Sequence, residues 1–230
     1  MDYYLGLDIG TSGTKSLIMN AKAEVIATAT VEHPISAPKP GWSEQNPIDW
    51  WDSACKATRK VIKTADIDGK AIKGVGLSGQ MHGLVILEKA GEVIRPSLIW
   101  NDQRTGKQAA DIEANVGGRK KLIKLVGNMA QTSFTLTKLL WVRENEPKHY
   151  DRTAMMLLPK DYVRYRMTGE YVGEVSDMSG TLMLDPKKRD WSKTILDTFE
   201  IDRGILPPVV ESHDVTGRIT KHVAKELGFP

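Results

Sequence analysis

The sequence has 230 residues, of which 40% are hydrophobic and 27% charged, as expected for a globular chain that buries a sizeable core. These values exclude a disordered chain, a collagen and a coiled coil. The formal net charge of +3 creates no strong field, so nucleic acid and an anionic membrane are not expected partners. We expect one large domain.

The cysteine content and the N-terminus point to a location inside the cell. Cys55 is the single cysteine, which favours a reducing compartment. Residues 1–8 lack the basic start of a signal peptide, and the longest apolar runs are far shorter than the ~20 residues of a membrane helix. The histidines considered for a zinc framework are too widely spaced for a local metal cluster. They are His82, His149, His213 and His222. The sequence thus predicts a cytoplasmic protein.

The first half of the chain alternates strand and helix signals. Three short strands are predicted at 3–9, 15–19 and 25–30, joined by tight turns into an antiparallel meander. Asn46 and Pro47 are typical of a helix start, and the apolar spacing that follows indicates a helix with a broad buried face. Because Cys55 lies on that face, we expect it in the core and not as a nucleophile.

Further along the chain, buried strands are predicted at 72–77 and 84–87. Helices are predicted at 104–115, 118–126, 135–145 and 161–167, with Pro147 and Gly169 as stops. This order favours an α/β fold with a mixed five-stranded sheet that includes the antiparallel meander and is covered by helices.

Two glycine patterns resemble nucleotide motifs without meeting their structural requirements. Residues 74–79 match GxGxxG, but these glycines lie inside a predicted strand and no helix follows to receive a pyrophosphate. Residues 10–16 resemble a P-loop, yet Thr14 separates glycine from lysine and a strand follows. We therefore expect neither a dinucleotide fold nor a Walker A motif.

The second segment suits a phosphate-binding hairpin better. Asp8 ends the first strand, and the turn offers amides, the hydroxyls of Thr11 and Ser12, and glycines at positions 10 and 13 that permit close approach of an anion. A carboxylate beside this turn suits hydrated Mg²⁺, which keeps several waters. The alternative is an ordinary glycine-rich hairpin with a capping aspartate.

Residues 8–15 resemble the first phosphate motif of the FGGY carbohydrate kinases, which have a ribonuclease H-like, actin-like ATPase fold. Five further blocks occur in the order of that family. They are Gly41–Pro47 with Trp50 and Trp51, Ser78–Gly83, Trp100–Arg104, Leu158–Tyr162, and Ser176–Asp177 with Ser179–Thr181. Together they resemble the N-terminal half of the members that phosphorylate D-xylulose, from about residue 3 to the end of the chain.

The resemblance implies roles for individual residues, with ATP and Mg²⁺ as cofactors. Asp8 would hold Mg²⁺ through water and be important for catalysis, and Thr11, Ser12, Gly13 and Lys15 would receive the nucleotide phosphates. The expected sugar contacts, with Met81 and His82 as the central pair, are Gln80, Met81, His82, Trp100, Asn101 and Asp102. Trp100 is either a stacking platform for the sugar or part of the core. Asp161 either lies near the site or is a first-turn helix acid.

The resemblance also implies a longer parent protein. Kinases of this family are about twice as long as this chain, and their catalytic base is an aspartate in a segment that would follow residue 230. We therefore expect residues 1–230 to be a sugar-binding N-terminal lobe without its C-terminal nucleotide-binding domain, inactive by itself. The parent would transfer the γ-phosphoryl group of ATP to O5 of D-xylulose, and a homodimer is one option for its assembly.

Two alternatives remain open at this point. One is another FGGY kinase, acting on gluconate or a different pentulose. Glycerol is disfavoured, since the glycerol kinases of the family have Arg-Glu where this chain has Met81 and His82. The other is a non-catalytic actin-like module that binds a sugar or a partner. An aspartate in the segment beyond residue 230 would support the kinase.

Overall fold

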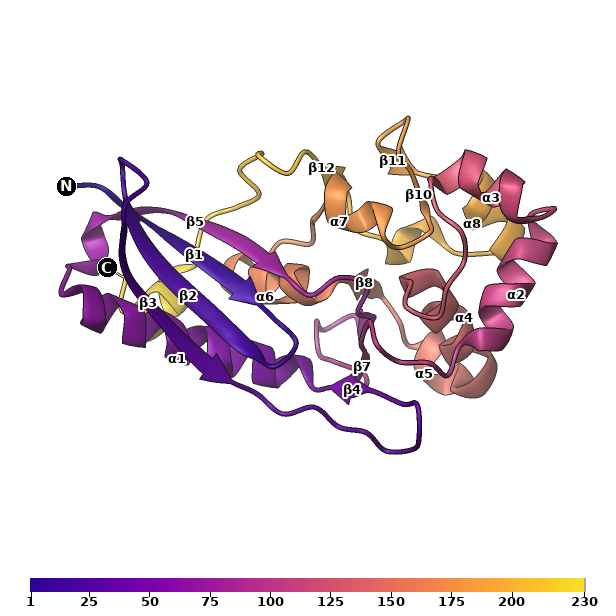
Figure 1. Ribbon diagram of the computed structural model, residues 1–230, viewed down its shortest axis with the longest axis horizontal. Coiled ribbons are helices and arrows are strands. Elements are labelled where there is room, and N and C mark those ends of the chain that lie inside the picture. The colour runs from indigo at the N-terminus through magenta and orange to yellow at the C-terminus, as the bar shows by residue number, and fades with distance from the viewer. Residues whose placement is uncertain (230) are drawn as a thin grey trace.

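A four-stranded sheet forms one end of the molecule, and helices form the other (Figure 1). The computed structural model describes residues 1–229. The strand order is β3-β2-β1-β5. The strands are β1 (Tyr3–Ile9), β2 (Gly13–Asn20), β3 (Val25–Glu32) and β5 (Ile72–Gly79). β1, β2 and β3 form the predicted antiparallel meander, and β5 pairs parallel to β1. The sheet is mixed, but it has four strands and not the predicted five.

The predicted strand at 84–87 does not join this sheet. It corresponds to β6 (Val85–Leu87), which pairs antiparallel with β8 (Met155–Leu157). The chain leaves the sheet at a turn in which His82 has a left-handed backbone with φ 65°. Such a conformation cannot continue a strand.

The prediction that β5 is buried is also wrong. None of its residues is buried, and within residues 1–229 no strand pairs with its outer edge. Two of its positions, Gly74 and Gly76, have no side chain to bury.

α1 (Pro47–Ala65) covers one face of the sheet (Figure 1). It begins as predicted, because the Asn46 side chain accepts a hydrogen bond from the Ile48 N–H at 3.1 Å. Apolar residues of α1, of the sheet and of α6 (Pro159–Thr168) and α9 (Lys221–Leu227) share one core. Cys55 is buried in it, and burial raises the pKa of its thiol to about 12. Its assignment to the core is confirmed.

A second hydrophobic core fills the helical end. The helices around it are α2 (Gly106–Asn115), α3 (Arg119–Val126), α4 (Thr135–Asn145), α5 (Pro147–Asp151), α7 (Val175–Ser179) and α8 (Lys193–Phe199). The four predicted helices are present, with α4 at the predicted bounds. Pro147 ends α4 and also begins α5, since proline is tolerated in a first helical turn.

The remaining elements are short. They are β4 (Glu44–Gln45), η1 (Gly69–Ala71), β7 (Ser97–Leu98), β9 (Gly173–Glu174), β10 (Leu184–Asp185), β11 (Asp190–Trp191), η2 (Arg203–Ile205) and β12 (Val209–Val210). No helix within residues 1–229 has both the length and the apolar character needed to cross a membrane.

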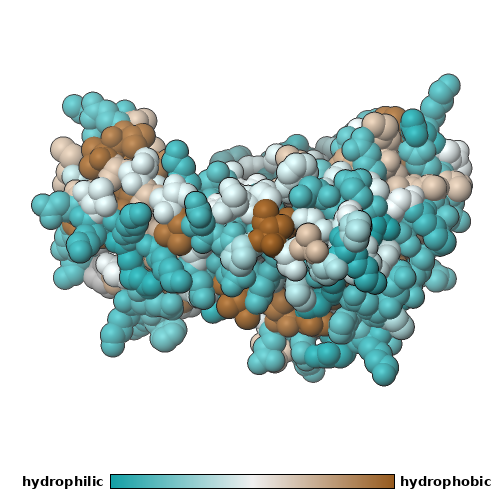
Figure 2. Space-filling model, turned by 60° about the horizontal axis from the view of Figure 1, so that its bottom comes forward, coloured by the Kyte–Doolittle hydropathy of each residue, from teal (hydrophilic) through white to brown (hydrophobic). Residues whose placement is uncertain are grey.

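The sheet face opposite α1 is open, and the β1–β2 hairpin points toward the middle of the molecule (Figure 1). In the space-filling view the outline dips between the two ends, and hydrophobic residues appear in small separate groups on a mostly hydrophilic face (Figure 2). The fold thus brings the hairpin tip close to the loops that lead into the helical end.

Candidate functional site

The turn between β1 and β2 is tight and depends on two glycines. The Gly10 N–H donates to the Gly13 carbonyl at 3.1 Å. A Cβ atom on Gly10 would lie 3.0 Å from the Gly13 oxygen, and one on Gly13 would lie 2.8 Å from the Val31 oxygen. Any side chain would therefore distort this turn. The hydroxyl-bearing residues Thr11 and Ser12 form its tip.

A row of polar residues crosses the open face of the sheet beside this turn. Asp8 pairs with Lys15 on β2 and with Ser78 on β5, and all three are exposed. In the described part of the chain the Asp8 carboxylate has no ion pair, and no group of three or more His, Cys, Asp or Glu side chains is placed to hold a metal. A single free carboxylate fits Mg²⁺ that keeps its waters, and does not fit an all-protein metal cage.

Buried side chains hold the hairpin in place through hydrogen bonds. The Gln45 amide donates to the carbonyl of Thr11 at 2.7 Å and to that of Pro34 at 3.0 Å. Its oxygen accepts from the Gln80 amide at 2.7 Å and from the Trp50 indole at 3.1 Å. All hydrogen-bonding groups of the Gln45 side chain are therefore used.

His33 is a second support that no sequence motif indicated. Its Nε2 lies 3.0 Å from the Gly10 carbonyl oxygen and its Nδ1 lies 3.1 Å from the Ser53 hydroxyl. Burial lowers the pKa of this imidazole. A neutral ring can donate at Nε2 and accept at Nδ1, which satisfies both neighbours.

Met81 and His82 form the turn after β5. Met81 is exposed, and the His82 ring lies against Phe134 with 4.5 Å between ring centroids. Burial, with a smaller effect from the Lys138 charge, lowers the pKa of His82 to about 4. The ring is therefore neutral near neutral pH, and its buried Nδ1 has no hydrogen-bond partner in residues 1–229. A neutral imidazole can accept or donate one hydrogen bond to a hydroxyl.

Trp100 and Asn101 are exposed next to this turn. Trp100 is 43% exposed, so it belongs to the surface and not to the core. Its indole N–H donates to the Thr11 hydroxyl at 2.9 Å. This bond connects the hairpin directly to the loop that carries Asn101.

A cavity of about 760 Å³, here called the Trp100 cavity, opens beside these residues. Its volume is in the range of small-molecule sites. It is lined by Met81, His82, Trp100, Asn101, Gln103, Gly106, Ala109, Ala130, Gln131, Thr132, Ser133 and Phe134. None of these side chains is charged near neutral pH, because His82 is neutral there.

Two of the predicted sugar contacts are not at the surface. Asp102 is fully buried, and its carboxylate accepts hydrogen bonds from the Arg104 guanidinium and from the Ser43 N–H. Gln80 is also buried, with its amide bonded to Gln45. The structure thus gives both residues internal partners, and the expectation that they contact a sugar is not supported.

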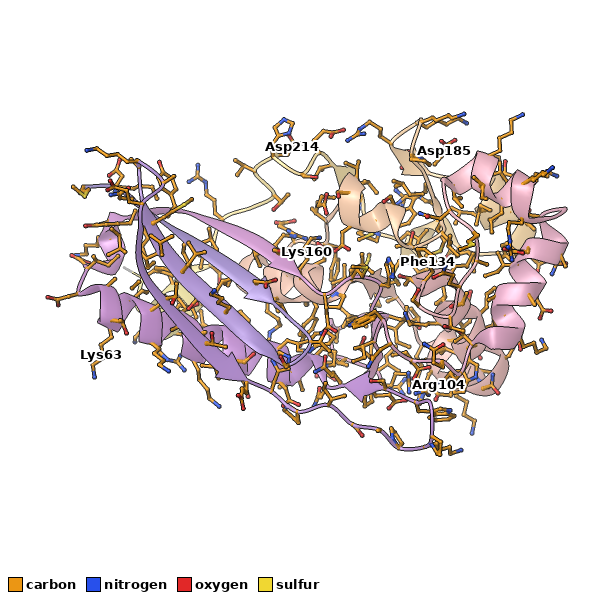
Figure 3. The ribbon with its side chains drawn as sticks, viewed as in Figure 1. Lys63, Arg104, Phe134, Lys160, Asp185 and Asp214 are labelled. Carbon is orange, nitrogen blue, oxygen red and sulfur yellow. The ribbon has the colours of Figure 1, made fainter. Side chains whose placement is uncertain are left out.

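A second cavity of about 610 Å³ is also lined by Met81 and His82. Its wall includes Lys160, whose ammonium lies 3.0 Å from Asp161, 2.9 Å from Asp177 and 3.4 Å from Glu174. Burial lowers the pKa of Lys160, but Asp161 and Asp177 outweigh this effect and raise it above its usual range. Lys160 lies beside the end of the sheet, and Phe134 lies at the helical end (Figure 3). Asp161 is thus near the site and is also an ion-pair partner.

The mixed sheet, the hairpin and the adjoining cavity define one lobe of an actin-like ATPase fold. The sequence profile of the N-terminal domain of the FGGY family of carbohydrate kinases matches residues 3–230. The chain therefore belongs to the FGGY family of carbohydrate kinases.

Individual relatives agree with this assignment. The xylulose kinase of Bacillus subtilis (strain 168) is 41% identical over 100% of this chain and 46% of its own length. The crystal structure of a "xyloylose kinase" from Brucella ovis, 37% identical, superposes with a TM-score of 0.94 over 99% of this chain and 46% of that one. A gluconate kinase from Lactobacillus acidophilus, 26% identical, has a TM-score of 0.92 over 100% of this chain and 46% of its own. The chain spans about half the length of the curated relatives it matches.

Proposed function

We propose that this chain is the N-terminal, sugar-binding lobe of an ATP-dependent kinase that phosphorylates D-xylulose at O5. The observation that carries the proposal is the direct connection between the two halves of the site. The Trp100 indole bonds the hairpin residue Thr11 at 2.9 Å, and the Gln80 N–H bonds Ile9 at 2.8 Å. A phosphate-binding turn and a sugar-sized cavity therefore share one rigid framework. Phosphoryl transfer needs that proximity.

The proposed roles follow from exposure and chemistry. Asp8 would hold hydrated Mg²⁺, and the turn from Thr11 to Gly13, with Lys15 beside it, would receive the nucleotide phosphates. Mg²⁺ bound there would neutralise charge on the phosphates during transfer. Met81, His82, Trp100 and Asn101 would contact the sugar. The base that accepts the sugar proton and most of the adenosine contacts would come from the second half of a longer protein, as the 46% coverage of the relatives supports.

The Trp100 cavity favours a neutral sugar over gluconate. A bound carboxylate is normally matched by arginine or lysine. Within this lobe the cavity has uncharged walls, and the nearby Lys160 in the second cavity already pairs with three carboxylates. Gluconate is therefore the weaker candidate, although one structural relative is named a gluconate kinase.

A coupled assay on the full-length protein tests this proposal. We expect ADP release from ATP and Mg²⁺ in the presence of D-xylulose, and much slower release with gluconate, glycerol or other pentuloses. If turnover is fastest with gluconate, the assignment of D-xylulose as the substrate is wrong and gluconate takes its place. An absence of turnover with every sugar would support a non-catalytic binding module instead.

His82 gives a sharper test within the same assay. If its imidazole bonds a ketose hydroxyl, His82→Ala leaves that hydroxyl unpaired and lowers kcat/KM for D-xylulose by about 5- to 100-fold. Sugar-independent ATP hydrolysis, which uses Asp8 and the hairpin, should fall by a much smaller factor. His213→Ala, at an exposed histidine, is the matched control. Equal losses in both activities would remove His82 from the sugar site.

A further inference from the structure

Lys138 on α4 is a fully buried lysine that the proposed function leaves without a role. Its ammonium donates to the backbone carbonyl of His82 at 2.9 Å and also to that of Ser133. These are the hydrogen bonds of its Nζ within the described residues, and both acceptors are carbonyl groups. A lysine without a carboxylate partner in a buried position is unusual, since burying an unpaired charge is unfavourable.

The pairing with two carbonyls explains how the site accommodates the lysine. Burial lowers the pKa of Lys138 to about 7, and the charge of Asp102 opposes this effect only through space. A neutral amine still has two N–H donors, which equals the number of carbonyls it contacts. The bridge therefore persists whether or not the amine carries its third proton.

The two carbonyls belong to two separate segments that line the Trp100 cavity. One is the turn of Met81 and His82, and the other is the loop of residues 130–134. Among residues 1–229, Lys138 is the residue whose side chain donates hydrogen bonds to both segments. Thr135, also on α4, adds a hydrogen bond from its hydroxyl to the His82 carbonyl at 3.2 Å.

His82 needs such support because of its backbone. Its φ of 65° is uncommon for a residue with a side chain and has to be maintained by the surroundings. Donors on its carbonyl fix the orientation of the peptide group that follows it. The imidazole of the same residue lies against Phe134, which directly follows the second acceptor, Ser133.

We propose that Lys138 is a positioning residue that holds the His82 turn and the 130–134 loop at a fixed separation and so sets the affinity of the Trp100 cavity for its sugar. The expected effect on sugar affinity rests on the proposed function, whereas the hydrogen bonds of Lys138 to the two segments do not depend on that function. A merely structural lysine would affect folding stability and leave sugar affinity unchanged.

The test compares Lys138→Met with Lys107→Met in the full-length protein. Methionine has a similar length but no N–H donors, and Lys107 is an exposed lysine on α2. We expect Lys138→Met to raise KM for D-xylulose by about 10-fold or more, from loss of two hydrogen bonds at the cavity wall, with KM for ATP changed by less than about 2-fold. Lys107→Met should leave both values unchanged. An unchanged sugar KM in folded Lys138→Met overturns the inference.

Two further measurements cover other outcomes. If Lys138→Met does not fold, Lys138→Gln takes its place, because its amide keeps two N–H donors on a shorter side chain, and a raised sugar KM is again expected. NMR of ¹³C-labelled histidines reports on His82 without turnover. Its ring signal should shift in the Lys138 variant and stay in place in Lys107→Met. If the protein phosphorylates no sugar, the proposed function fails, and an unmoved His82 signal would then also reject the role of Lys138.

Discussion

At the scale of single residues, two polar side chains that are adjacent in the sequence differ in whether they point into the protein or toward solvent. Asn101 is exposed at the Trp100 cavity, whereas Asp102 is fully buried in its bond to Arg104. The resemblance to a family implied that both residues contact the sugar, and the structure leaves only Asn101 of the two exposed. Which of two adjacent polar side chains points inward depends on the turn and on a distant partner such as Ser43, so the sequence pattern could not show it.

Asp8→Asn tests the metal role proposed for this carboxylate. The change keeps the size but removes the charge, so in the full-length protein kcat should fall by at least about 100-fold, as for loss of one electrostatic stabiliser. KM for the sugar should change little, because Asp8 lies on the open face of the sheet and not in the Trp100 cavity.

Steady-state kinetics at saturating Mg²⁺ measures this effect, with Asp197→Asn at an exposed position of α8 as the control. Near-normal kcat in Asp8→Asn would show that Asp8 is only a turn residue.

The titration of Lys138 predicts how stability depends on pH. Its pKa is 10.5 in an unfolded chain and about 7 in the fold, so between these values the unfolded state binds more protons. Stability from this group therefore increases as pH rises through the window and is lost as pH falls toward 7.

Urea unfolding of the wild type and of Lys138→Met between about pH 7 and pH 9.5 isolates the effect, because other groups cancel in the difference. As pH rises, the free energy of unfolding of the wild type should increase relative to that of Lys138→Met by up to about 1.4 kcal/mol per pH unit. Besides Asp102, the titratable neighbour is His82, which is neutral throughout this range. A difference that does not vary with pH would show an ordinary, unshifted lysine.

At the scale of elements, local sequence signals predicted the positions of the helices well. The capping residue Asn46, the proline after it and the helical spacing placed the start of α1, and α4 was located by its apolar run. The failures concern partners far apart in the sequence. The pairing of β6 with β8 joins segments about 70 residues apart, and no local pattern encodes it.

Asn46→Ala tests the cap of α1. The substitution removes the acceptor for the Ile48 N–H and should lower the free energy of unfolding by about 1 kcal/mol. Asn46→Asp keeps an acceptor at the same position and should retain most of the stability. Thermal or urea unfolding of the two variants provides the comparison. Equal stability of Asn46→Ala and wild type would mean that packing alone defines this end of α1.

At the scale of the whole molecule, residues 1–229 form two hydrophobic cores. Composition predicted one large domain but not its division into a sheet end and a helical end. The candidate site lies between these two ends, where the hairpin meets the Trp100 cavity. This location follows from the tertiary arrangement, so the sequence indicated the sugar-contact residues only through their resemblance to a family, whereas the residue types of the hairpin indicated phosphate binding directly.

The isolated chain provides the prediction at this scale. Its two cores should let residues 1–230 fold cooperatively, yet phosphoryl transfer requires both substrates and an acceptor-side base in place. We expect a sigmoidal thermal transition and no sugar-dependent ATP turnover above a buffer control. Turnover by this chain alone would contradict the division of the site between two lobes.

The Gln45–Gln80 pair under the hairpin has a consequence for sequence change in this family. Both amides are buried, but Gln45 also bonds the Trp50 indole and the carbonyls of Thr11 and Pro34. Replacement of Gln80 by an apolar residue therefore removes one of four partners of Gln45, whereas replacement of Gln45 leaves the Gln80 amide and three further groups without that partner. In a double-mutant cycle the two losses should be non-additive, because the bond between the two amides is lost only once. The two positions are therefore unequal under sequence change: a lineage can vary Gln80 at a moderate penalty, but one that loses Gln45 has to replace the whole hydrogen-bond network beneath the hairpin.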